Sequence, residues 1–101
     1  MARHILEVSP ESAKVVFENS TVRIIEITMK KGQTIRMHSH KKGLSYSVNA
    51  GRIRSTDRAG RSNVISVKRG DVGWSDVDGM ETHAVQNLGG LLRELCVEFK
   101  Q

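Results

Sequence analysis

The sequence predicts an all-β domain, a sandwich or barrel built from short strands. Turn-forming residues recur at short intervals, for example at residues 31–32, 57–60 and 78–79. The segments between these turns are short and rich in β-branched residues. Several short strands at such a spacing are typical of antiparallel sandwiches and barrels. With no internal repeat, low-complexity tract or linker in the sequence, one β domain is expected over residues 1–101.

The expected elements follow in chain order from these signals. Near the N-terminus, Ser9 can cap a helix, Pro10 suits the first helical position and Glu11 complements the helix dipole. One short helical turn is therefore expected there. The β-branched segments between turns predict strands at Val22 to Met29, Ile35 to His40, Leu44 to Val48, Val64 to Lys68 and Leu92 to Phe99.

Side-chain alternation predicts which residues share a face of each strand. Residues two apart in a strand point to the same side. Arg36, His38 and His40 are therefore expected to project together. By the same rule, Arg52 and Arg54 are expected to share a face of a later strand.

Composition limits the class of protein. The chain has 101 residues, of which 38% are hydrophobic and 27% charged, which suits one folded domain. No apolar run approaches the ~20 residues that a membrane helix needs. Glu7 interrupts the apolar start that a signal peptide would require. Because the single cysteine, Cys96, cannot form an internal disulfide, a cytoplasmic protein without a membrane partner is expected.

The formal charge of +5 is unevenly distributed. Residues 30–69 contain eleven basic residues and one acidic residue, Asp57. Such a basic block can indicate nucleic-acid binding, an anionic small molecule or a solvated face. Nucleic-acid binding also needs aromatic platforms or a reading helix, and Tyr46 is the one aromatic residue in the block. A solvated face or a small anionic ligand is therefore expected, and nucleic acid is not.

Three of the four histidines form a candidate metal site. In an extended segment, His38 and His40 would lie on one face about 6–7 Å apart, which suits two adjacent positions on one metal ion. A third ligand must come from a distant strand, and His83 is the candidate. His4 precedes the first predicted strand and receives no role.

These residues resemble the motifs of the cupin superfamily. Residues 32–51, with His38-Ser39-His40 between two glycines, resemble the first cupin motif, in which two histidines and a glutamate bind a metal. Residues 70–87, with His83 and Asn87, resemble the second motif and its single metal-binding histidine. The resemblance extends from about Phe17 to Phe99. It implies a cupin-type β-barrel, that is, a double-stranded β-helix or jelly roll.

The sequence departs from the family pattern in two places. The position of the metal-binding glutamate holds Leu44, or Ser45 with a shift of one, and neither is a carboxylate. The interval between Gly70 and His83 is two residues longer than the usual pattern, so the loop before His83 is expected to be rearranged. Glu81 in this loop is expected to be a surface charge rather than a substitute ligand.

Three histidines without a carboxylate imply one divalent ion, with iron, nickel, manganese and zinc as candidates. Such an ion keeps its full charge and leaves coordination positions open to an anion or water. On iron this arrangement suits dioxygen chemistry, and on zinc it suits water activation. The resemblance implies either a metal-dependent enzyme of the oxygenase or isomerase type, or a non-catalytic cupin that binds a small ligand or keeps a structural metal.

Further residues are candidates for binding an anionic ligand or for catalysis. Arg36 shares the predicted face of the histidines, and Arg52 and Arg54 are expected nearby; their planar guanidinium groups match a carboxylate. The alternative places these arginines at the mouth or outside of the barrel, with their charges in water. Trp74 is expected to pack near the cavity, with the core as the alternative. Tyr46, expected to point inward, is the catalytic candidate or else a core aromatic.

Assembly is the last expectation from the sequence. The apolar strand from Leu92 to Phe99 would need protection if it lay at a sheet edge. Pairing across a twofold axis is the commonest solution, and dimers are frequent among similar cupins. A homodimer is therefore expected.

Overall fold

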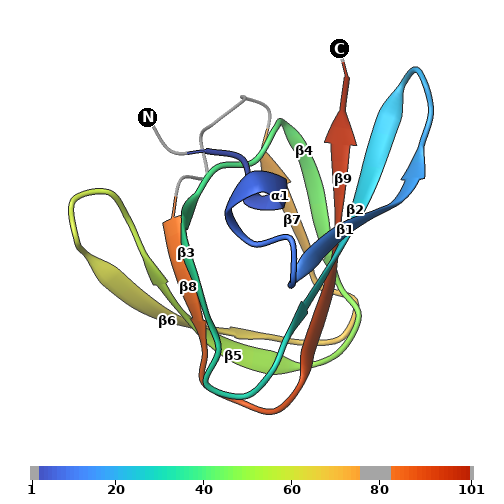
Figure 1. Ribbon diagram of the computed structural model, residues 1–101. Coiled ribbons are helices and arrows are strands. Elements are labelled where there is room, and N and C mark those ends of the chain that lie inside the picture. Colours follow the sequence, from blue (N-terminus) through green and yellow to red (C-terminus); the bar gives the residue numbers. More distant parts are fainter. Residues whose placement is uncertain (1–2, 76–82, 101) are drawn as a thin grey trace.

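Two antiparallel sheets face each other in the computed structural model, which describes residues 3–75 and 83–100 (Figure 1). The five-stranded sheet contains, in spatial order, β1 (Ala13–Glu18), β2 (Val22–Met29), β9 (Leu92–Phe99), β4 (Gly43–Ser47) and β7 (Val72–Ser75). The four-stranded sheet contains, in spatial order, β3 (Thr34–His38), β8 (His83–Asn87), β5 (Gly51–Thr56) and β6 (Ser62–Val67). From β2 onward the chain crosses repeatedly between the two sheets, which is the jelly-roll arrangement.

The strands predicted from the sequence are confirmed. Val22–Met29 and Leu92–Phe99 have the predicted bounds, and the other three predicted strands begin or end within two residues of β3, β4 and β6. The all-β jelly roll is therefore confirmed as well.

The short N-terminal helix is present, but it lies earlier in the chain than predicted. The helix α1 (Ile5–Val8) ends before Ser9, so Ser9 is its C-cap and not its N-cap. The N-cap is His4, whose Nδ1 accepts the backbone N–H of Leu6 at 3.1 Å. Burial of Ile5, which is 1% exposed, places the helical turn here and overrides the local capping preference of Ser9. Among the described residues α1 is the only helix, and four residues are too few to cross a membrane.

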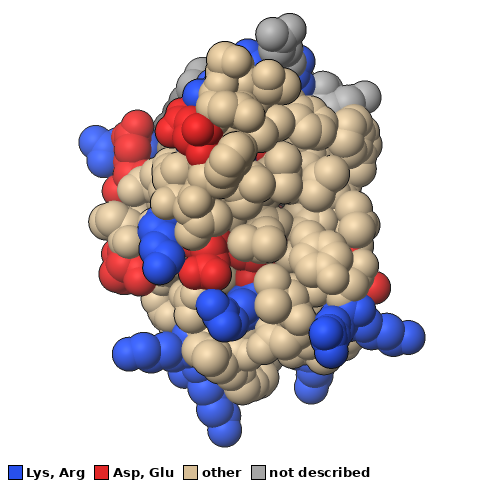
Figure 2. Space-filling view, turned by 90° about the vertical axis from the view of Figure 1, so that its right-hand side faces the viewer, with Lys and Arg blue, Asp and Glu red and all other residues tan. Residues whose placement is uncertain are grey.

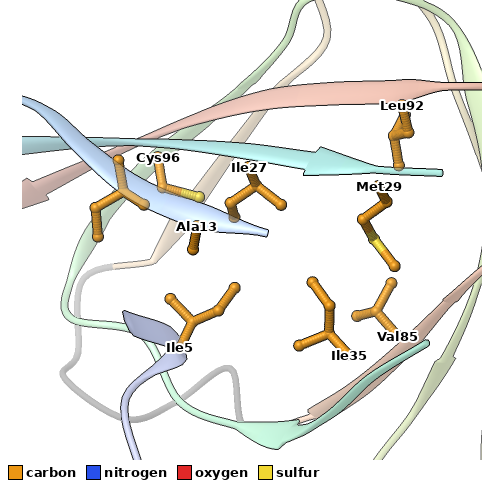
Figure 3. Packing of buried hydrophobic residues seen from close by; sticks show 9 residues of the cluster. Ile5, Ala13, Ile27, Met29, Ile35, Val85, Leu92 and Cys96 are labelled. Atoms are coloured by element: carbon orange, nitrogen blue, oxygen red, sulfur yellow. The ribbon is translucent and has the colours of Figure 1, made fainter. Parts of the chain in front are cut away.

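The core lies between the two sheets. Figure 3 shows Ile5 of α1 facing the side chains of the five-stranded sheet, and Ile35 and Val85 of the four-stranded sheet facing Met29. Burying each large aliphatic side chain contributes about 1.5–3 kcal/mol. The buried apolar residues are Ile5, Ala13, Ile25, Ile27, Met29, Ile35, Val85, Leu92 and Cys96.

Asn87 joins the turns at the lower end of the barrel in Figure 1. Its fully buried side chain donates from Nδ2 to the carbonyl groups of Met29, Lys30 and Gly90, and its Oδ1 accepts the N–H of Gly89. This ties the β2–β3 turn to the β8–β9 turn.

The strand Leu92–Phe99 is not an edge strand. β9 pairs with β2 on one side and with β4 on the other, so its backbone groups are satisfied along both edges. The edges of the five-stranded sheet are β1 and β7. The apolar strand named in the dimer prediction is therefore not itself an edge, because strand order depends on pairing between segments far apart in the chain.

Candidate metal centre

Three histidine side chains converge inside the barrel, at the end opposite to the turns that Asn87 joins. One nitrogen from each of His38, His40 and His83 lies within 4.8 Å of the other two. His38 and His83 are direct cross-strand partners on β3 and β8, and their ring centroids are 4.8 Å apart. The ring of His40 is 4.9 Å from that of His38 and 5.5 Å from that of His83. The predicted grouping of these three histidines is confirmed.

A β-bulge in β3 turns His38 inward and leaves Arg36 outside. Ile35 pairs with Val85 and His38 pairs with His83, so β3 has one residue more than β8 in this interval. The extra residue reverses the alternation, and Ile35 and His38 both face the interior. The predicted common face of Arg36, His38 and His40 is therefore wrong. Arg36 is exposed, and its guanidinium donates to the carbonyl of Val8 at 3.4 Å.

Hydrogen bonds orient the imidazole rings of His38 and His83. Nδ1 of His38 lies 2.8 Å from the carbonyl oxygen of Arg36. A carbonyl only accepts, so Nδ1 carries the proton and Nε2 keeps its lone pair. Nδ1 of His83 lies 3.1 Å from Oγ of Ser55, on the neighbouring strand β5. Such bonds on the far nitrogen are how proteins set the orientation of metal-binding histidines.

The nitrogen positions fit a divalent ion. Nε2 of His38 and Nε2 of His40 are 3.1 Å apart. Ligands bound at 2.0–2.1 Å are separated by about 2.9 Å at a right angle and about 3.4 Å at a tetrahedral angle. A cation between these two Nε2 atoms would bind both of their lone pairs, whereas without a cation the two rings can satisfy each other only if one Nε2 carries a proton. Nδ1 of His40 is buried and has no hydrogen-bond partner among the described residues, and an ion bound at Nε2 would not change that.

The environment keeps these histidines neutral, which is the form that binds metal. Burial, with smaller effects from His38 and His83, lowers the pKa of His40 to about 3. Burial and the neighbouring His38 lower the pKa of His83 to about 4. Burial also lowers the pKa of His38.

The metal-free protein is expected to lose stability as the pH falls from about 6.5 to 5. The pKa of each buried histidine lies below the usual 6.5, so the unfolded chain binds protons that the folded chain excludes. Each such histidine then removes up to about 1.4 kcal/mol from the free energy of unfolding per pH unit. Urea unfolding of chelator-treated protein at pH 7, 6 and 5 measures this slope.

The control for the pH experiment is the double variant His40→Gln, His83→Gln. It lacks two of the three titrating rings, so its stability is expected to change much less over the same range. Equal slopes in the variant and the wild type would show that these histidines titrate normally in the folded state.

Neither Leu44 nor Ser45, the two positions predicted for a glutamate ligand, supplies a carboxylate, and they lie on opposite faces of β4. Ser45 pairs with the buried Cys96 and faces the interior, whereas Leu44 pairs with Val97 and lies on the outer side of the sheet. Among the described residues, the three-histidine group includes no carboxylate. Glu81 and the rest of the loop before His83 lie outside the described residues.

A buried carboxylate nevertheless lies behind His40. Glu98 on β9 is 3% exposed and accepts hydrogen bonds from Nε2 of His4 at 2.5 Å, from Arg23 at 2.7 Å and from the backbone N–H of Lys41 at 3.2 Å. Burial alone would raise the pKa of Glu98, but these hydrogen bonds outweigh it and lower the pKa to about 2. Glu98 thus fixes the backbone directly after His40.

His4 also helps to hold the segment around His40. This role was not predicted from the sequence. Its Nδ1 accepts from Leu6, so its Nε2 carries the proton donated to Glu98, and its ring lies edge-on to His40 with centroids 6.4 Å apart. The backbone of Ser39 also bonds to Arg3 and Ile5 on both sides of His4. No local pattern marks His4 or Glu98, because they lie 94 residues apart.

The histidines line a cavity of about 660 Å³, a size that holds a small organic molecule. One part of its wall is apolar, with Met29, Ile53 and Val85. Hydroxyl groups of Ser45 and Ser55 belong to the same wall.

The remaining predicted site residues are not brought to the histidines. Arg52 and Arg54 are exposed on the outer side of β5, and Arg54 donates to Gln86 at 3.3 Å. Tyr46 is 40% exposed on the outer side of β4, so its predicted inward direction is wrong. Trp74 on β7 is among the residues that line the cavity, as predicted, but it is 62% exposed, and its ring lies 5.6 Å from the ring of Phe99.

Comparisons with solved structures show the fold of this chain. No family model and no curated protein matches the sequence. Among solved structures, a cupin domain from Bordetella pertussis Tohama I is similar with a TM-score of 0.78 and 20% identity, over 100% of this chain and 99% of that chain. A cupin superfamily protein from Desulfitobacterium hafniense DCB-2 gives a TM-score of 0.63 and 16% identity, over 88% of this chain and 76% of that chain. An RmlC-like cupin protein from Desulfovibrio desulfuricans gives a TM-score of 0.56 and 19% identity, over 90% of this chain and 86% of that chain.

Proposed function

Because this chain has the cupin fold, we propose that it is a metal-binding cupin in which His38, His40 and His83 hold one divalent ion beside a cavity for a small anionic molecule. The observation that carries the proposal is the convergence of three neutral imidazoles on the wall of a ligand-sized cavity. When bound, the ion would supply a Lewis-acidic site with positions open to a ligand.

The preference for an anion rests on charge at the metal. Three neutral histidines leave the two positive charges of a divalent ion unbalanced. The charge of the nearby Glu98 is already matched by Arg23, with which it forms a 2.7 Å ion pair. An anionic ligand would therefore balance the ion. Arg36, Arg52 and Arg54 are exposed, so they do not enter this argument.

The walls of the cavity offer both apolar and polar contacts to a bound ligand. The apolar wall at Met29, Ile53 and Val85 would exclude water from a bound ligand. The hydroxyl groups of Ser45 and Ser55 can donate hydrogen bonds to its polar atoms. Iron, nickel, manganese and zinc all accept imidazole ligands, and an oxygenase-like or isomerase-like enzyme would use this arrangement.

A non-catalytic ligand-binding cupin is the second candidate. The observation that favours it is the outward position of Tyr46, the acid predicted from the sequence. In both cases we place the protein in the cytoplasm as a single-domain homodimer, without nucleic-acid or membrane partners.

Metal analysis of the purified protein tests the proposal. We expect about one equivalent of metal in the wild type, and less than a tenth of that in the double variant His38→Ala, His83→Ala, since one histidine cannot hold the ion. Elemental analysis gives the identity and amount of the metal. Calorimetric titration of the loaded protein with acetate and with acetamide, a neutral molecule of the same shape, then tests the preference for an anion.

The control is the double variant Arg52→Ala, Arg54→Ala, which truncates two exposed side chains on the outside of β5 and is expected to keep the metal. A wild type without metal, even after reconstitution with iron, nickel, manganese and zinc in turn, would exclude the metal site. With metal present, oxygen uptake or isomerisation assays separate the enzyme from the binding protein.

A further inference from the structure

The strand β6 forms an open edge of the four-stranded sheet. Within the part of the chain that the structure describes, β6 pairs with β5 alone, so the opposite edge of its backbone carries no strand. Every residue from Ser62 to Ser66 is exposed. Figure 1 shows the β5–β6 hairpin extending away from the rest of the barrel, which explains why neither face of β6 is covered. This edge is therefore accessible to a partner.

β6 lacks the devices by which proteins protect sheet edges. Such devices include bulges, very short strands, proline and charged side chains within the strand. The edge strands β1 and β3 each contain a bulge, and β7 has only four residues. β6 has six residues in regular register with β5, and its sequence, Ser-Asn-Val-Ile-Ser-Val, contains neither a charge nor a proline. Among the described edges, β6 is the one suited to accept another strand.

Backbone groups of alternate β6 residues point to the open edge. The N–H of Leu88 donates to the carbonyl of Arg52, so the backbone groups of Arg52 face β8 and not β6. In an antiparallel pair of this kind, the bonding groups of both partners point away from each other. Ser66, the β6 partner of Arg52, and Val64, two residues before it, therefore direct their N–H and C=O groups to the open edge.

Two arginines of β5 lie on the outer side of this edge. Arg52 is opposite Ser66, and Arg54 is opposite Val64. Arg54 donates to the neutral amide of Gln86 at 3.3 Å, and neither arginine forms an ion pair with a described residue. Strands lie about 4.8 Å apart, so a strand added to β6 would lie about 10 Å from β5. Because the side chains of Ser66 and Val64 are short, both arginines can extend over β6 toward acidic groups on that strand.

Basic residues also flank β6 along the chain. Residues 51–69 contain six basic residues and one acidic residue, which already forms a 3.2 Å ion pair with one of them. Arg58 precedes β6, Lys68 and Arg69 follow it, and all three are exposed. In Figure 2 the side chains that project from the lower end of the molecule are basic, and Figure 1 places β5 at this end. A partner along β6 would meet positive charge at both of its ends, which favours an acidic partner.

The inner side of the same edge is apolar. Ile65 pairs with Ile53, and both line the cavity between the sheets. Ile65 is nevertheless 42% exposed, because no described strand lies beyond β6 to cover it. An added strand would bury this side chain, which favours binding. Since side chains alternate along a strand, a partner that suits both sides of the edge has acidic and apolar residues in alternation.

We propose that the open edge of β6 binds an extended acidic segment of another protein, which adds to the four-stranded sheet as a fifth strand. Its acidic side chains face Arg52 and Arg54, and its apolar side chains face Ile65. The edge lies outside the three-histidine site, so this interaction does not depend on the metal of the proposed function.

Charge and chemistry disfavour other occupants of this edge. Antiparallel pairing of two β6 strands would bring Lys68 and Arg69 of each copy toward Arg58 of the other, and like charges so placed repel each other. Nucleic acid has no peptide backbone to pair with the edge, and residues 51–69 contain no aromatic side chain on which bases could stack.

Fluorescence anisotropy with a labelled peptide of alternating glutamate and valine, as long as β6, tests this edge. We expect saturable binding that weakens by at least about tenfold between about 0.05 and 0.5 M sodium chloride, because the charges are exposed. The same peptide with lysine in place of glutamate is expected not to bind. Amide hydrogen exchange measured by NMR should slow at Val64 and Ser66, because the new strand bonds to their backbone groups.

The variant Val64→Pro removes one N–H group from the open edge and is expected to weaken binding by at least about tenfold. Proline is tolerated in an edge strand where the N–H faces solvent, so β6 should keep its pairing with β5. The matched control Val64→Thr keeps the N–H and a β-branched side chain, and it should bind within about twofold of the wild type. N-methylation of the peptide's glutamates blocks the same bonds without changing the protein, so it tests the edge even where Val64→Pro does not fold.

Three results would overturn the proposal. One is a glutamate–valine peptide that does not bind, or a lysine peptide that binds equally well. Another is undiminished binding of the N-methylated peptide. The third is a wild type that sediments at a multiple of 11.2 kDa while Val64→Pro sediments as a smaller species, since a second copy would then occupy the edge. The His38→Ala, His83→Ala variant should bind the peptide as the wild type does, which separates this edge from the metal site.

Discussion

Replacing Glu98 by alanine is expected to lower the free energy of unfolding by about 3 kcal/mol, because it removes one partner of a largely buried ion pair. Glu98 accepts from the side chains of His4 and Arg23 and from the backbone of Lys41. Without the carboxylate, the partly buried guanidinium of Arg23 loses its counter-charge. The Lys41 N–H also loses its acceptor.

The same substitution is expected to weaken metal binding. Lys41 follows His40 directly, so Glu98 holds the backbone that presents the His40 ring. Residues that support metal ligands in this way typically change affinity by about 10–100-fold. Competition with a chromophoric chelator measures the affinity, and urea unfolding measures the stability.

The matched control for Glu98 is Glu26→Ala. Glu26 is also a carboxylate on the five-stranded sheet, but its pairs with Lys14 and Arg93 are partly exposed, so its loss should cost less than about 1 kcal/mol. The low pKa of Glu98, about 2 against a usual 4.5, adds a pH signature. Its stabilisation is complete above pH 4.5 and is lost toward pH 2, so the difference between wild type and Glu98→Ala should shrink over that range. Equal effects of the two substitutions would contradict this role.

A methyl group at Gly43 is expected to prevent normal folding. Gly43 starts β4 beside the central strand β9, and a Cβ there would lie 1.8 Å from the carbonyl oxygen of Val97. The atoms that it would meet belong to the β9 backbone, which cannot move without breaking its pairing with β2. The backbone at Gly43 also has a φ of +155°, which side chains rarely adopt. We expect Gly43→Ala to cost about 4 kcal/mol or more.

Gly60→Ala is the control for Gly43→Ala, because it tests the cost of a positive φ without a steric clash. Gly60 also has a positive φ, +86°, but a Cβ there would meet no atom within 4 Å. Its substitution should cost only about 1–2 kcal/mol. Thermal unfolding of both variants, with the soluble fraction after expression as a second readout, gives the comparison. A Gly43→Ala protein as stable as Gly60→Ala would show that β4 and β9 can separate at no great cost.

The sequence by itself determined the β-rich class, the positions of five of the nine strands among the described residues, and which three histidines would come together. Turn residues and β-branched segments are local signals, so the bounds of Val22–Met29 and Leu92–Phe99 could be predicted directly. The three histidines could be recognised because the spacing of His38 and His40 resembles the first cupin motif and the residues around His83 resemble the second.

Side-chain directions near the site were decided only by tertiary structure. Alternation predicts a common face for Arg36 and His38, but one extra residue in β3 reverses it, and the bulge is defined by pairing with β8, nearly fifty residues later. The inward direction predicted for Tyr46 failed for a related reason, since its strand is oriented by pairing with β7 and β9.

The contacts that support the three histidines also required the fold. His4, Glu98 and Arg23 are unremarkable in sequence, and they meet only because β9 returns beside β2 and the N-terminal turn packs on the barrel. Local sequence fixes what each short segment can form, whereas the contacts that position the histidines join segments up to 94 residues apart.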